Sequence, residues 1–68
     1  MEYIEGLVSV IVPCYNYEVF IRETLESVIG QTYTNLEIIV CDNGSTDNTA
    51  NIIREYSALD KRIKAIFI

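Results

Sequence analysis

Residues 7–16 read LVSVIVPCYN, and this stretch decides the fold class. Its first six residues are apolar apart from one serine and rich in β-branched side chains, which is typical of a strand in a parallel sheet. Pro13 has no N–H for a sheet ladder, so we expect the strand to end there and a loop to follow. Two similar runs come later, LEIIVC at residues 36–41 and IKAIFI at residues 63–68.

Apolar residues at helical spacing separate these three runs. The first stripe predicts a helix over residues 17–29 and consists of Ile21, Leu25, Val28 and Ile29. Asn16 is the expected N-cap of this helix, and Gly30 is expected to end it in a left-handed conformation. The second stripe predicts a helix that ends between residues 57 and 60 and consists of Ile52, Ile53 and Tyr56.

The turn DNGS at residues 42–45 precedes this second helix. Ser45 or Thr46 is the expected N-cap, and Gly44 is expected to have a positive φ. The order is therefore β-α-β-α-β, an α/β fold of parallel strands with the first strand in the middle or at an end of the sheet. Parallel sheets are covered by helices on both faces, which two helices do poorly. We therefore expect residues 1–68 to be the N-terminal part of one longer domain, with residues 1–6 as an N-terminal extension.

The composition excludes several classes of function. Ten acidic residues against five basic ones, a net charge of −5, argue against a protein that binds nucleic acid or an anionic membrane. The cluster of basic residues Lys61, Arg62 and Lys64 is interpreted as a solvated loop and strand entry rather than an anion site. The absence of histidine argues against a zinc site and against Ser-His or Cys-His nucleophiles.

Cys14 and Cys41 lie too far apart for a CxxC motif and are interpreted as small buried hydrophobic residues. Reduced buried thiols are typical of a cytoplasmic protein. Neither a signal peptide nor a membrane-spanning run is visible in the sequence.

Ligands of open α/β sheets bind beyond the carboxyl ends of the strands, where residues 13–16 and 42–45 are expected to meet. Tyr15 could stack on a base there or pack over the strand end. Asp42 and Asn43 could bind a ligand, but from their position alone a local turn with a helix cap is the favoured explanation. The sequence has neither the glycine-rich dinucleotide fingerprint nor a P-loop.

Three segments carry a resemblance to a known family. VSVIVPCYN at residues 8–16, TLESVIGQTY at residues 24–33 and EIIVCDNGSTDNT at residues 37–49 resemble, in this order, motifs of family 2 glycosyltransferases. The resemblance implies the GT-A fold, a Rossmann-like nucleotide-sugar-binding domain. It also implies transfer of a sugar from a nucleotide-diphosphate donor, with UDP- or TDP-sugars favoured, to a hydroxyl of a glycan, lipid or other acceptor.

The resemblance also assigns roles to residues. Pro13, Cys14 and Tyr15 are expected to lie against the nucleoside, with Tyr15 near the base, and Cys14 stands where Thr or Ser is common. An acidic pair that contacts base or ribose is matched by Asp42, whereas Asn43 replaces its second member. The Mg²⁺- or Mn²⁺-binding D-x-D and the catalytic base lie on later segments of such enzymes. No catalytic or metal-binding residue is therefore expected here, and the isolated chain is expected to be inactive.

Two alternatives stay open at this stage. One is a truncated, non-catalytic module that binds nucleotide or associates with a partner; the other is a different α/β nucleotide-binding protein, such as one for NAD or ATP. The expected location is the cytoplasm, or the cytoplasmic face of a membrane for a full-length enzyme. The sequence does not indicate an oligomeric state.

Overall fold

The computed structural model describes residues 7–31 and 35–68 and has five elements. They are β1 (Val8–Cys14), α1 (Glu18–Ile29), β2 (Leu36–Asp42), α2 (Thr49–Leu59) and β3 (Ile63–Phe67). The order β-α-β-α-β confirms the predicted fold class. The expected extension at residues 1–6 lies outside the described residues.

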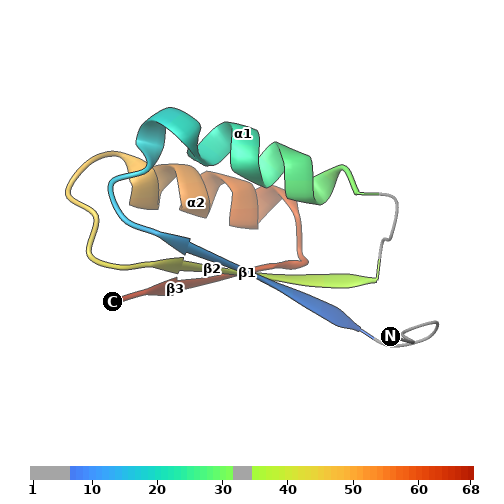
Figure 1. Ribbon diagram of the computed structural model, residues 1–68. Helices are drawn as coiled ribbons and strands as arrows, with labels where there is room; N and C mark the ends of the chain where they lie inside the picture. Colours follow the sequence, from blue (N-terminus) through green and yellow to red (C-terminus); the bar gives the residue numbers. More distant parts are fainter. Residues whose placement is uncertain (1–6, 32–34) are drawn as a thin grey trace.

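The three strands form one parallel sheet in the order β1-β2-β3. Val8 pairs with Leu36 at one end of the ladder, and Cys14 pairs with Asp42 at the other. The first strand therefore lies at an end of the sheet, one of the two predicted positions. Right-handed crossovers that all advance in one direction place their helices on one face, and Figure 1 shows α1 and α2 side by side on the same side of the sheet.

The core lies between this face of the sheet and the two helices. It consists of Val12, Cys14, Leu36, Ile38, Val40 and Ile63 from the strands and Ile21, Leu25, Val28, Ile52, Ile53 and Tyr56 from the helices. Both predicted helical stripes are buried here, apart from the partly buried Ile29. Each fully buried isoleucine or leucine contributes about 1.5–3 kcal/mol relative to an exposed one.

Two polar contacts join α1 to α2 outside the core. Arg22 on α1 forms a two-point ion pair with Glu55 on α2, with N–O distances of 2.9 and 3.1 Å. The hydroxyl of Tyr56 donates a hydrogen bond of 2.7 Å to Glu26. These contacts fix the helices to each other independently of the loops at their N-terminal ends.

The opposite face of the sheet is covered by neither α1 nor α2. Side chains of alternate parity point there, and Pro13, Cys41 and Ile66 are aligned across the three strands. Ile11 is 60% exposed and Ile66 is 47% exposed. The described helices thus bury one face of the sheet, and the other face carries both exposed apolar side chains and the polar Ser9, Glu37 and Lys64.

Two predicted boundaries are wrong. Pro13 lies within β1, opposite Cys41, and its missing N–H would point away from β2, so the pairing of these two strands loses no hydrogen bond. Gly30 has φ −81° and is not left-handed. Its N–H donates to Glu26 O at 3.0 Å, so Gly30 keeps a right-handed backbone conformation where the chain leaves α1.

The predicted helix caps are also wrong, whereas the turn glycine is correct. The N-cap positions are Tyr17 and Asn48, and neither makes a side-chain capping hydrogen bond. Asn16 has φ 46° and its side chain points to a different partner, described below. Gly44 has φ 78°, as predicted for this turn.

Candidate functional site

A hollow of about 300 Å³ lies at the edge of the sheet where the strands end. We call it the edge hollow, and it is lined by Pro13, Cys14, Tyr15, Cys41, Asn43 and Ile68. Four of the five residues predicted from the sequence line it, from the ends of β1 and β2. Open α/β sheets bind ligands at this edge, where loops supply the polar groups.

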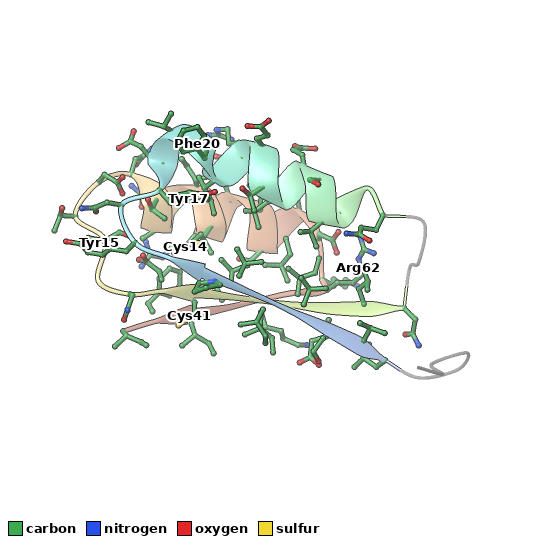
Figure 2. All side chains as sticks on the ribbon, viewed as in Figure 1. Cys14, Tyr15, Tyr17, Phe20, Cys41 and Arg62 are labelled. Atoms are coloured by element: carbon green, nitrogen blue, oxygen red, sulfur yellow. The ribbon has the colours of Figure 1, made fainter. Side chains whose placement is uncertain are left out.

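Tyr15 follows β1 and is 62% exposed, so most of its ring lies in solvent. Figure 2 shows its side chain at the end of the molecule where the strands terminate. This exposure favours a ring with a free face over the alternative, a ring packed across the end of the buried strand. An exposed aromatic face beside a hollow can stack on a flat ligand.

Asp42 and Asn43 are neighbours in sequence but lie in different surroundings. Asp42 is 4% exposed, and its Oδ1 accepts hydrogen bonds from the N–H and the hydroxyl of Ser45. Asn43 is exposed and lines the edge hollow, while its N–H donates to Cys14 O at 2.9 Å. In this structure Asn43 lines the hollow, whereas the carboxylate of Asp42 holds the turn.

The two cysteines also differ in burial. Cys14 is buried as predicted, and burial raises the pKa of its thiol, as does the negative charge of the nearby Asp42 carboxylate. Cys41 is only partly buried and lines the edge hollow, so the prediction that both are buried is wrong for Cys41. The sequence signal for Cys41 is its position one residue before Asp42, which puts it on the other face of the strand.

The loop after β1 is bound to the loop after β2 through three successive backbone N–H groups. The N–H of Asn16 donates to Ser45 Oγ at 2.8 Å, that of Tyr17 to Thr49 Oγ1 at 2.8 Å, and that of Glu18 to Asp47 Oδ2 at 3.2 Å. These N–H groups stand at the start of α1, where a helix has no partner of its own for them.

Three backbone N–H groups of the loop after β2 likewise donate to side chains near the start of α1. Asn16 Oδ1 accepts the N–H of Thr46 at 2.8 Å and of Asp47 at 3.3 Å, and Glu18 Oε1 accepts the N–H of Asn48 at 3.1 Å. The N–H of Thr49, the first residue of α2, instead donates to Asp47 of its own loop. The hydrogen bonds between the two loops thus bind the N–H groups of residues 16–18 and 46–48. We call this set of hydrogen bonds the cross-loop clamp.

Asp47 carries much of the charge in the cross-loop clamp. Desolvation acts to raise the pKa of its carboxyl, but hydrogen bonds from the Thr49 hydroxyl and N–H and from the Glu18 N–H lower the pKa below its ordinary value. The clamp is therefore built around an ionised carboxylate at neutral pH.

A second hollow, of about 360 Å³, lies at the amino ends of the strands. It is lined by Leu7, Leu36, Glu37, Lys61, Arg62 and Lys64. Arg62 binds Asp60 with N–O distances of 2.8 and 3.1 Å and also reaches Ile29 O. This guanidinium stabilises the turn before β3, whereas the two lysines are exposed.

The described residues contain no group of three or more His, Cys, Asp or Glu side chains that could hold a metal ion. Asp42 is engaged by Ser45, and Asn43 supplies a neutral amide. These residues do not fit a divalent metal site. Over residues 7–31 and 35–68, neither helix has the length and apolar character needed to cross a bilayer.

The sequence matches the family described as "Glycosyl transferase family 2" over residues 9–67. It is 60% identical over 60 residues to an uncharacterized glycosyltransferase of Haemophilus influenzae, covering 88% of this chain and 19% of that protein. It is 48% identical over 60 residues to an Escherichia coli UDP-Glc:alpha-D-GlcNAc-diphosphoundecaprenol beta-1,3-glucosyltransferase, covering 88% of this chain and 23% of that protein. Chondroitin synthase of Escherichia coli is 43% identical over 60 residues, which are 88% of this chain and 9% of that enzyme.

One solved structure has the same fold over most of the chain. A mannosyltransferase from Pyrobaculum calidifontis, in complex with GDP-Man and Mn²⁺, superposes with a TM-score of 0.79 and 33% sequence identity. The match covers 88% of this chain and 19% of that one. The 68 residues thus span less than a quarter of each of these proteins.

Proposed function

This chain belongs to glycosyl transferase family 2, and from that membership we propose that it forms the nucleoside-binding part of an enzyme that transfers a sugar. The donor is a nucleotide-diphosphate sugar, and the acceptor is a hydroxyl group. The edge hollow is the observation that carries this proposal, because two of the three segments that resemble family motifs, residues 8–16 and 37–49, meet there.

The chemistry of the edge hollow supports a nucleoside as its ligand. Tyr15 supplies an exposed ring for stacking, and Asn43 supplies an amide that both donates and accepts hydrogen bonds. The imide edge of uracil or thymine presents an N–H beside a carbonyl oxygen, which complements that amide. We therefore favour a UDP- or TDP-sugar. GDP is included in the test because the mannosyltransferase structure from Pyrobaculum calidifontis is a complex with GDP-Man.

Asp42 has a supporting place in this proposal. Its Oδ1 fixes the turn that carries Asn43 by accepting both hydrogen bonds from Ser45, so a contact with the ribose would use Oδ2. Pro13 and Cys14 form the wall of the hollow at the end of β1. The family resemblance assigns all five residues to nucleotide binding.

The reacting atoms lie outside this part of the site. We propose that a divalent ion, Mg²⁺ or Mn²⁺, and the catalytic base are held by residues beyond the described ones. When bound, such an ion neutralises charge on the diphosphate leaving group. The described residues bind and orient the nucleoside and are not placed among the catalytic groups.

The relatives suggest the class of acceptor. Their names include a chondroitin synthase and a glucosyltransferase acting on a diphosphoundecaprenol-linked sugar. We propose that the acceptor is a growing glycan or a lipid-linked sugar in polysaccharide synthesis. The enzyme would act in the cytoplasm or at the cytoplasmic face of a membrane.

Nucleotide titration of the ¹⁵N-labelled chain, followed by NMR, tests the proposal. UDP, TDP and GDP are compared with NAD and ATP at equal concentrations. We expect UDP or TDP to shift the amide signals of Tyr15 and Asn43 and to leave those of Lys61 and Lys64 in place. Preference for NAD or ATP, or the absence of shifts at the edge hollow with every nucleotide, contradicts the proposal.

A sugar-transfer assay distinguishes this proposal from the alternative that the 68 residues are an active enzyme by themselves. We expect the 68-residue chain to transfer no sugar from UDP-sugars with Mg²⁺ or Mn²⁺ present. Detectable transfer would show that the metal and the base lie within these residues. If a longer protein containing this chain bound nucleotide but transferred no sugar, the result would instead support the alternative of a non-catalytic module.

A further inference from the structure

Asn16 links the two loops that line the edge hollow. It directly follows Tyr15, and with φ 46° it is the one non-glycine residue with positive φ among residues 7–31 and 35–68. Asparagine tolerates this left-handed conformation better than most residues. The conformation aims the Asn16 side chain across to the other loop, where Oδ1 accepts the N–H groups of Thr46 and Asp47.

A second connection runs through the backbone of the same residue. The Asn16 N–H donates to Ser45 Oγ, and the Ser45 hydroxyl donates to Asp42 Oδ1. Asp42 immediately precedes Asn43 in the turn that borders the hollow. Asn16 therefore holds Tyr15 on one side and the turn carrying Asn43 on the other.

We propose that Asn16 is a positioning residue for nucleotide binding: it sets the placement of Tyr15 relative to Asn43 across the edge hollow. This inference rests on the proposed function of the same site. Asn16 itself is not among the lining residues, so it acts through the cross-loop clamp and touches no ligand. A purely structural role would lower the stability of the chain and leave the affinity of the folded chain unchanged.

Two substitutions separate the parts of this role. Asn16→Gly keeps access to positive φ and removes the acceptor for two backbone N–H groups. Asn16→Asp keeps an acceptor in the same place and also tolerates the left-handed region. Arg22→Ala is the matched control, because it removes the ion pair between α1 and α2 far from the hollow and leaves the cross-loop clamp intact.

The affinity of the 68-residue chain for UDP is measured by calorimetry, and urea unfolding gives the stability of each variant. We expect Asn16→Gly to weaken UDP binding about tenfold, because the two loops must then be ordered when the ligand binds, and Asn16→Asp to restore most of the affinity. Arg22→Ala is expected to lose stability and keep its affinity. NMR order parameters should fall at both Tyr15 and Asn43 in Asn16→Gly and stay unchanged in Arg22→Ala.

The outcomes distinguish this inference from the proposed function. Wild-type affinity in Asn16→Gly, or an equal loss in Arg22→Ala, overturns the positioning role while nucleotide binding by the wild-type chain stands. A wild-type chain that binds none of the nucleotides overturns the proposed function, and the inference falls with it.

Discussion

Cys14 and Cys41 lie on adjacent positions of neighbouring strands but on opposite faces of the sheet. Cys41 pairs with Pro13, and Cys14 pairs with Asp42, so the two thiols differ by one residue in register. Figure 2 shows Cys14 between the sheet and the helices and Cys41 on the side away from them. Because one residue of register reverses the side-chain direction, the sheet itself keeps these thiols apart.

The two thiols should react at different rates with an alkylating reagent. We expect iodoacetamide to label Cys41 in the native chain and to spare Cys14, whose thiol is buried and has a raised pKa. UDP should slow the labelling of Cys41, which lines the edge hollow. Mass spectrometry of the labelled peptides measures both rates.

Denaturation provides the reference for the labelling experiment. In urea both cysteines should react, and Cys41→Ser should remove almost all labelling of the native chain. Equal native rates at Cys14 and Cys41 would contradict the opposite-face arrangement. If saturating UDP left the labelling rate of Cys41 unchanged, the bound nucleotide would not cover this thiol.

Removal of the Tyr15 ring should weaken nucleotide binding and leave the fold intact. Stacking of a base on an aromatic ring contributes about 1–3 kcal/mol, so we expect Tyr15→Ala to weaken UDP binding about tenfold. Tyr15→Phe should keep most of the affinity. Since Tyr15 is 62% exposed, the free energy of unfolding should change by less than about 0.5 kcal/mol.

Phe20→Ala is the control for Tyr15, because Phe20 is 54% exposed on α1 and does not line the hollow. It should leave UDP affinity unchanged in the same calorimetric titration. An equal loss of affinity in both alanine variants would mean that Tyr15 acts through the general surface and not through stacking.

Replacing Gly44 or Gly30 with alanine should change the free energy of unfolding by different amounts. Gly44 has φ 78°, so Gly44→Ala should lower the free energy of unfolding by about 1–2 kcal/mol. Gly30 has φ −81°, although a Cβ there would lie 3.2 Å from Glu26 O, and Gly30→Ala should cost less than about 1 kcal/mol. Urea unfolding measures both, and Gly44→Asn should recover part of the loss because asparagine tolerates the left-handed region.

Acid should destabilise the chain through carboxylates whose pKa is lowered in the folded state. Hydrogen bonds from Thr49 outweigh desolvation at Asp47, and the Arg22 and Arg62 guanidinium groups lower the pKa of Glu55 and Asp60. A lowered folded pKa gives stability that is present above the unfolded pKa and is lost as the pH falls through the folded pKa. The urea midpoint should therefore fall steadily below about pH 4.

Asp47→Asn combined with Glu55→Gln tests this origin of the acid dependence. The double variant should be less stable than wild type at pH 7, and its stability should change less between pH 5 and about pH 3. An acid dependence as steep as that of wild type would assign the effect to other groups.

Local sequence rules predicted the elements and most of the core but failed at the helix starts. Asn16 has the residue type and the position of an N-cap, and a local rule assigns its side chain to its own helix. The structure gives that side chain to Thr46 and Asp47, 30 and 31 residues away. No rule restricted to neighbouring residues can find a partner at that distance.

The same limit explains the errors at Pro13 and Cys41. Pro13 is compatible with β1 because its missing N–H would point away from β2, and the direction of an N–H depends on how a strand is paired in the sheet. Cys41 is partly exposed because both helices cover the other face, which the apolar run of β2 does not reveal. Gly44 was predictable because its positive φ is a demand of the turn alone.

The cross-loop clamp also has a consequence for the order in which the chain folds. The partners in the clamp are separated by 29 or more residues, so the N–H groups at the start of α1 gain their side-chain acceptors only once the loop after β2 has formed. The N–H groups of residues 46–48 before α2 likewise wait for the loop after β1. Helices this short are marginal in isolation. The two strand–helix units should therefore fold together in one cooperative step, and neither should persist as a structured intermediate.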